Sequence, residues 1–70
     1  MKITIESTSQ IVQFDGIEAR VWEGETESGI KVIAFITRLS VDENEDCEQF
    51  ERELKQTRKP SVYWPLRMAL

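Results

Sequence analysis

The acidic stretch Asp42–Glu48 (DENEDCE) holds the densest group of side chains that could bind a cation or move a proton. An EF-hand loop needs oxygen ligands at alternating positions, a central glycine and a glutamate at its twelfth position. No glycine follows Gly29, so this stretch does not fit such a loop. We interpret it as the solvated start of a helix, which could also contact a basic partner. The predicted acidic surface consists of Glu43, Glu45, Asp46 and Glu48.

The side chains that most catalytic and metal sites require are scarce in this chain. Histidine is absent, and Cys47 is the single cysteine. Most metal sites built from imidazole and thiolate are therefore excluded, as is every nucleophile activated by histidine. Cys47 lies in helical register with Phe50 and Leu54, so we expect it to pack in the core rather than to react. With little room for a deep pocket in 70 residues, the sequence predicts no enzyme activity, no cofactor and no metal.

Aromatic side chains are the best candidates for a binding site. Tryptophan and tyrosine dominate the energetics of protein interfaces, and arginines could accompany them. The alternative is that these aromatic residues complete a small core. The predicted protein-binding residues are Trp22, Arg20, Arg38, Tyr63, Trp64, Leu66 and Met68.

The net charge is −4, from 13 acidic and 9 basic residues. This charge disfavours direct nucleic-acid binding, whose affinity comes from Lys and Arg at phosphates. It leaves open an acidic mimic that blocks the DNA- or RNA-binding groove of another protein. No apolar run approaches the roughly 20 residues that a membrane helix needs, and polar residues follow Lys2 where a signal peptide would be apolar. We therefore expect a cytoplasmic protein without a membrane partner.

Alternating or clustered apolar residues predict strands in the first part of the chain. The pair Asp15-Gly16 predicts a tight turn, because both positions accept a positive φ. Further on, we expect Glu23, Glu25 and Glu27 to be solvated in the turn of a long hairpin. The predicted strands cover residues 2–6, 10–15, 17–25 and 30–41.

The last of these segments, Ile30–Val41, is apolar on both sides. Such a strand is normally central in a sheet and covered on both faces. One helix covers one face only. The second face is then covered by the end of this chain or by another chain, because large exposed apolar patches mark interfaces.

The helix has clear signals at both ends. Asp42 occupies the N-cap position, Glu45 completes a capping box, and Pro60 stops the helix. We predict a helix at about residues 43–58, docked through Cys47, Phe50 and Leu54.

The end of the sequence, residues 61–70 (SVYWPLRMAL), is rich in apolar residues. Pro65 is incompatible with a central strand but allows an edge strand. We therefore predict one domain over residues 1–70, of α+β class. It has an antiparallel meander of about four strands, one helix packed on one face, and a tail that covers the other face or adds an edge strand.

The runs ARVWEGETESGIKVIAFITRLSV and QFERELKQTRKPS and the ending PLRMAL resemble small uncharacterised proteins encoded by bacteriophages and prophages. This resemblance implies an accessory protein in the cytoplasm of a bacterial host. Compact acidic phage proteins often act by binding and blocking a host protein. The leading hypothesis is therefore a non-catalytic protein that binds and modulates a host protein. The alternatives are a homodimeric structural protein and the acidic nucleic-acid mimic.

Overall fold

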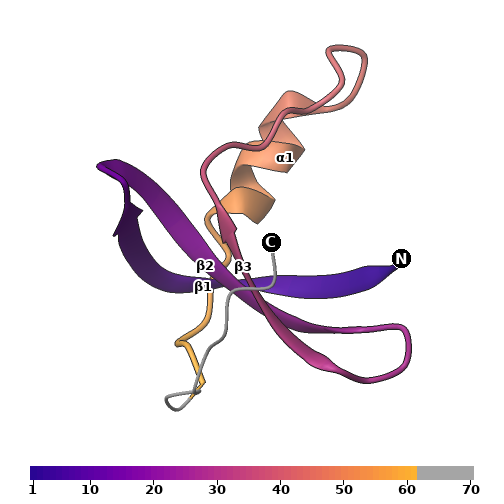
Figure 1. Ribbon diagram of the computed structural model, residues 1–70. Helices are drawn as coiled ribbons and strands as arrows, with labels where there is room; N and C mark the ends of the chain where they lie inside the picture. The colour runs from indigo at the N-terminus through magenta and orange to yellow at the C-terminus, as the bar shows by residue number, and fades with distance from the viewer. Residues whose placement is uncertain (62–70) are drawn as a thin grey trace.

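The computed structural model describes residues 1–61, which form an α+β structure. The strands β1 (Ile3–Phe14), β2 (Ile17–Thr26) and β3 (Lys31–Ile36) make one antiparallel sheet in the order β1-β2-β3, and the helix α1 (Cys47–Leu54) follows (Figure 1). The predicted α+β class and antiparallel meander are confirmed. The predicted count of four strands is wrong for residues 1–61, which form three. The predicted tail lies, apart from Ser61, outside the described residues.

The two N-terminal strands predicted from the sequence are one strand with an irregularity. β1 pairs with β2 on both sides of a register shift between Ser7 and Ile11. Within this bulge the Thr8 side chain is fully buried, and its hydroxyl donates to the carbonyl oxygen of Val21 at 2.7 Å. A bulge interrupts the alternation of side chains. The polar residues here therefore looked like a break between two strands.

The turns differ in how well the sequence predicted them. Asp15 and Gly16 have φ angles of 50° and 80°, which confirms the tight turn between β1 and β2. In the second hairpin β2 ends at Thr26, one residue beyond its predicted end at residue 25. Gly24 lies inside β2 opposite Ile5. A Cβ atom there would fall on the carbonyl oxygen of Thr4. Gly24 thus allows β1 and β2 to approach closely.

The start of the helix is four residues later than its predicted first residue. Asp46 is the N-cap, and its carboxylate accepts a hydrogen bond from the Gln49 amide at 3.0 Å. The predicted cap, Asp42, instead closes a turn that precedes the helix, where its carboxylate accepts from the Asn44 amide at 2.9 Å. Both aspartates have cap-like geometry. The sequence alone did not separate them.

The helix also ends earlier than predicted, at Leu54 rather than at residue 58. The chain leaves the helix because the backbone of Arg58 bonds to β1. The Ser9 amide donates to the Arg58 carbonyl at 2.7 Å, and the Arg58 amide donates to the Ser7 carbonyl at 3.4 Å. These bonds form a parallel bridge between Thr8 and Arg58. Arg58 thus belongs to the sheet edge rather than to the helix.

The sheet has two faces with different cover. Side chains that pair directly across strands share a face. The first, which we call the Val21 face, contains the two buried apolar residues of the described chain, Ala19 (2% exposed) and Val21 (5%). Phe14 and Phe35 pack beside them with ring centroids 4.8 Å apart. The opposite side, called the Trp22 face, carries Ile5, Ile11, Arg20, Trp22, Val32, Ala34 and Ile36.

The helix contributes little to this core. No residue of α1 is buried, Phe50 is half-buried and Leu54 is 42% exposed. The predicted core packing of Cys47 is wrong, because its side chain is exposed at the first turn. Figure 1 shows α1 beyond the end of β3 rather than across the sheet.

Candidate functional site

A shallow groove of about 280 Å³ lies where the Trp22 face meets the segment after β3 and the end of α1. Three of the predicted protein-binding residues, Trp22, Arg20 and Arg38, come together there. The other four, Tyr63, Trp64, Leu66 and Met68, lie outside the described residues. We call this site the Trp22 groove and define it by Ile11, Arg20, Trp22, Arg38, Leu39 and Leu54; Glu18 also lines it.

The strand register explains why these side chains meet. Arg20 and Trp22 are two residues apart on β2 and therefore project from the same face. Ile11 pairs with Arg20 from the β1 side. Trp22 pairs with two small residues, Ser7 on β1 and Ala34 on β3. These small neighbours leave space beside the indole ring.

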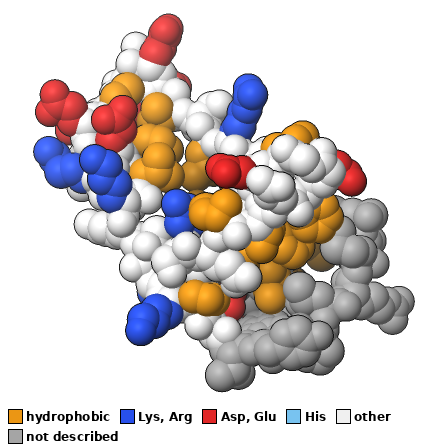
Figure 2. Space-filling view, turned by 90° about the vertical axis from the view of Figure 1, so that its left-hand side faces the viewer, with side chains coloured by type: hydrophobic (Ala, Val, Ile, Leu, Met, Phe, Trp, Pro, Cys, Tyr) orange, Lys and Arg blue, Asp and Glu red, His pale blue; other side chains and the backbone are white. Residues whose placement is uncertain are grey.

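The apolar side chains of the groove are open to solvent. Ile11 is 47% exposed, Leu39 46% and Leu54 42%, while Trp22 is half-buried. Figure 2 shows hydrophobic side chains gathered on the surface of the molecule, next to charged ones. Exposed apolar side chains that lie together and are rimmed by polar residues are candidates for contact with a partner.

The two arginines of the groove differ in burial and in how firmly hydrogen bonds hold their side chains. Arg20 is half-buried, and its Nη1 donates to the carbonyl oxygen of Thr8 at 2.7 Å. This bond fixes one side of the guanidinium while other N–H groups stay available. Arg38 is exposed. The groove therefore offers two guanidinium groups next to apolar side chains and the Glu18 carboxylate: Arg20, oriented by its bond to Thr8, and Arg38, which has no bonded side-chain partner within residues 1–61.

The predicted acidic surface lies apart from the residues that define the groove. Glu43, Glu45, Asp46 and Glu48 are all exposed, and Asp46 is occupied as the N-cap of α1. Across residues 1–61, no group of three His, Cys, Asp or Glu side chains is arranged to hold a metal ion. Hydrogen bonds within the chain engage Glu45, Asp46 and Cys47. These bonds do not indicate a ligand.

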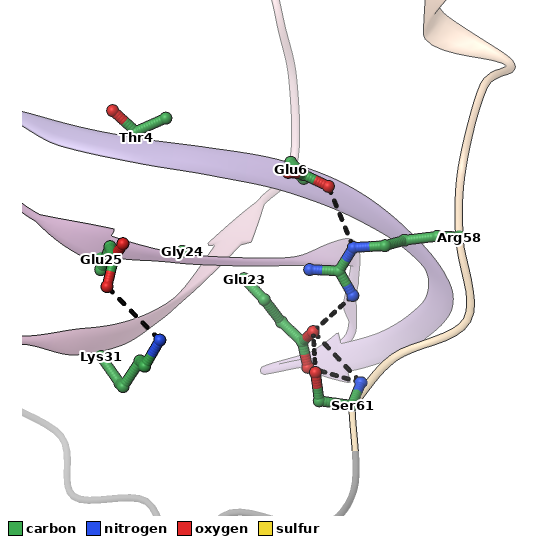
Figure 3. A pocket seen from close by; sticks show the side chains of 8 residues that line it. All are labelled: Thr4, Glu6, Glu23, Gly24, Glu25, Lys31, Arg58 and Ser61. Atoms are coloured by element: carbon green, nitrogen blue, oxygen red, sulfur yellow. Dashed lines mark hydrogen bonds and ion pairs between the residues drawn. The ribbon is translucent and has the colours of Figure 1, made fainter. Parts of the chain in front are cut away.

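A second site is polar and was not predicted from the sequence. Glu23, predicted to be solvated, is only 4% exposed and lies at the centre of what we call the Glu23 clamp, formed by Glu6, Glu23, Arg58 and Ser61 (Figure 3). Nη1 of Arg58 lies 2.7 Å from Oε1 of Glu23, and Nε of Arg58 lies 3.1 Å from Oε2 of Glu6. Ser61 donates to Glu23 from its amide, at 3.1 Å and 3.0 Å to the two oxygens, and from its hydroxyl at 2.9 Å.

The clamp sets the charge of both partners. Burial raises the pKa of the Glu23 carboxyl, but hydrogen bonds from Arg58 and Ser61 outweigh burial and hold that pKa below its ordinary value. The hydrogen bonds to Glu23 and then to Glu6 raise the pKa of the Arg58 guanidinium. The pair is therefore ionised at neutral pH. Its role is to hold residues 58–61 against the sheet.

One sequence signal could have revealed the clamp. Glu23 continues the alternation of Ala19 and Val21, so it faces the same side of β2 as the buried residues. Its partner Arg58 is 35 residues away, and no local pattern links the two. The run of glutamates around Glu23 favoured the interpretation as a loop.

No protein-family model matches this sequence, and no curated protein or solved structure is significantly similar to it. Within residues 1–61, no helix is long and apolar enough to span a membrane.

Proposed function

We propose that this protein is a non-catalytic protein-binding protein that uses the Trp22 groove to bind and modulate a host protein, in the manner of a phage accessory protein. The observation that carries the proposal is the groove itself. A half-buried tryptophan lies between exposed apolar side chains and two arginines. Tryptophan and arginine are the residue types that most often dominate binding energies.

The energetics support an apolar partner surface. Covering the exposed parts of Ile11, Leu39 and Leu54 would contribute roughly 1 kcal/mol for each side chain, given about 1.5–3 kcal/mol for complete burial. Trp22 adds an aromatic surface whose position is already fixed by its strand. A site fixed before binding loses less conformational entropy than a mobile one.

The two arginines of the groove outnumber its one carboxylate, Glu18, and favour a partner that carries carboxylates beside its apolar anchor. Arg38 has no bonded side-chain partner within residues 1–61 and can form a charge-assisted hydrogen bond, and Arg20 has N–H groups left over. This preference separates the proposal from the acidic mimic, which would bind a basic groove through Glu43, Glu45 and Glu48. Apolar contacts persist at high salt, whereas the mimic's binding weakens steeply.

The test is site-specific photo-crosslinking in bacterial cells with the full chain. A photoreactive amino acid at Leu39 samples the groove, and the same residue at Ser28, exposed in the loop between β2 and β3, is the matched control. We expect Leu39 to give a discrete adduct with one host protein that Ser28 does not give. Leu54→Glu should abolish that adduct, because it places a charge in the apolar groove without altering a buried residue.

The adduct then identifies a protein for a purified binding assay. Calorimetry with that protein should give binding that Leu54→Glu weakens at least tenfold and that high salt changes little. Equal crosslinking from both positions would overturn the proposal. Binding that Glu43→Gln and Glu45→Gln remove, but Leu54→Glu leaves intact, would instead favour the acidic mimic.

A further inference from the structure

The sequence of β3 does not suit its place in the sheet. β3 (KVIAFI) has five apolar residues that alternate between the two faces, and all five are half-buried. A strand apolar on both faces is typical of the interior of a sheet. Yet β3 is last in the strand order, and within residues 1–61 it pairs with β2 alone. Its outer edge carries backbone donors and acceptors that need a partner.

The opposite edge of the sheet shows how an edge is protected. β1 has the bulge between Ser7 and Ile11, and the backbone of Arg58 occupies the Ser7 carbonyl and the Ser9 amide. Bulges and covering segments are the usual devices against strand addition. β3 has no proline and no register shift, and its one charged residue is Lys31 at its start. Within residues 1–61, the β1 edge is therefore covered and the β3 edge has no paired strand.

We propose that two copies of this chain join through the outer edges of β3, antiparallel about a twofold axis at Ala34, to form a six-stranded sheet. A twofold axis perpendicular to the sheet keeps each face on its own side. A residue of β3 then pairs with a residue of the same face in the second copy. This condition limits the axis to the position of a residue rather than a point between two residues.

The axis at Ala34 gives a self-complementary register. Val32 pairs with Ile36 of the partner subunit on the Trp22 face, and Ile33 pairs with Phe35 of the partner subunit on the Val21 face. Lys31 lies opposite Thr37 of the partner subunit, so no like charges meet. An axis at Ile33 would place Lys31 opposite Phe35 of the partner subunit. Pairs of β-branched and aromatic residues stabilise an antiparallel ladder, and the axis at Ala34 forms such a pair between Ile33 and Phe35 whereas the axis at Ile33 does not.

The dimer also adds to the small apolar core of the single chain. The part of the chain that the structure describes buries only Ala19 and Val21 as apolar core. Chains of this size are marginally stable alone. Pairing makes β3 an interior strand and extends both faces across the axis. A second copy of β3 fits this edge, because in the proposed register each residue of β3 has a suitable partner.

The first test is disulfide trapping of the full chain in a Cys47→Ser background. Ala34→Cys places one thiol of each copy next to the axis, where paired Cα atoms are about 4.5–5.5 Å apart and within reach of a disulfide. Gln13→Cys, exposed on β1 at the far edge, is the matched control. We expect mild oxidation to convert Ala34→Cys to a species of twice the 8.2 kDa chain mass, and Gln13→Cys to remain single. Equal rates at both positions would overturn the proposal.

The second test uses charge at the same position. Ala34→Glu and Ala34→Lys each oppose a like charge across the axis, so each variant should sediment as a monomer while the unsubstituted chain sediments as a dimer. Mixing the two variants should restore a dimer that contains one copy of each, even if each alone is partly unfolded. A monomeric unsubstituted chain, or a mixture that stays monomeric, refutes the β3 pairing. Neither result bears on crosslinking from Leu39, so the host-protein proposal stands or falls separately.

Discussion

Nη1 of Arg58 lies 2.7 Å from Oε1 of Glu23, across 35 residues of sequence. This ion pair joins the segment after α1 to the central strand of the sheet. The carboxylate is almost completely buried, while the guanidinium side chain is 41% exposed. Breaking the pair therefore costs more at Glu23, whose carboxylate is buried, than at Arg58, whose guanidinium reaches solvent.

Glu23→Gln should lower the free energy of unfolding by about 1–2 kcal/mol, because a buried carboxylate with charged and hydrogen-bonded partners loses its charge. Urea titration followed by tryptophan fluorescence measures this change. Glu6→Gln is the matched control. The Glu6 side chain is 73% exposed, and exposed ion pairs contribute about 0–1 kcal/mol. Equal losses in the two variants would show that the buried position of Glu23 is unimportant.

Acid should remove the contribution of Glu23 to stability. Its pKa is lower in the folded chain than its ordinary value of 4.5, so the unfolded state binds the proton more readily. The contribution is therefore complete above the ordinary pKa and is lost as the pH falls through the folded pKa. Urea midpoints measured on both sides of that window should fall more steeply with acidification in the unsubstituted chain than in Glu23→Gln. Parallel pH profiles would contradict the expectation.

Gly24→Ala should be more destabilising than Gly29→Ala. At Gly24 an added Cβ meets the backbone of Thr4 and lies 2.7 Å from Cα of Ile5, so the paired strands must separate. Gly29 has a φ of 90° and open space around it, so alanine there costs only the left-handed strain of about 1–2 kcal/mol. Thermal unfolding by circular dichroism compares the two variants. A higher melting temperature for Gly24→Ala than for Gly29→Ala would refute the close approach of the strands.

Thr8→Val should cost about 1–3 kcal/mol, although it preserves the shape of the side chain. The buried hydroxyl donates to the Val21 carbonyl and accepts from the Gln10 amide at 3.3 Å. Both backbone groups would lose this partner. Thr4→Val, at an exposed position of the same strand, should change stability by less than about 0.5 kcal/mol. Urea unfolding of both variants checks the difference.

Asp46→Ala should expose the amides of α1, whereas Asp42→Ala should not. Asp46 caps the helix, and loss of a cap costs about 1 kcal/mol locally. Because α1 has no buried residue, global unfolding reports this loss poorly. Amide hydrogen exchange between Phe50 and Leu54 measures it directly. Faster exchange of these amides in Asp42→Ala would instead support Asp42 as the N-cap, as predicted from the sequence.

The elements that depend on local chemistry were predictable. The Asp15-Gly16 turn follows from two residues that accept a positive φ, and the alternation of Ala19 and Val21 placed them on the buried side of β2. The bounds of α1 were not predictable in the same way. Asp42 and Asp46 both have capping chemistry, and the helix ends early because Arg58 bonds to a distant strand.

The candidate site was predictable in part for the same reason. Period-two alternation places Arg20 and Trp22 on one face, and Arg38 follows soon after the end of the adjacent strand. The position of Leu54 beside them depends on the path of a long loop, which no residue pattern encodes. The Glu23 clamp could not be predicted, because the sequence does not distinguish a buried glutamate from a solvated one unless its cationic partner is known.

The two edges of the sheet differ, and this difference would limit the number of copies that could join edge to edge. If both edges accepted strands, each added copy would expose a fresh edge, and the product would be a fibre of unlimited length. Here the backbone of Arg58 occupies the middle of the β1 edge. Growth through β3 therefore consumes the only receptive edge of each copy in the described part of the chain. In the proposed dimer, Arg58, whose backbone covers the β1 edge, would therefore limit growth to two copies.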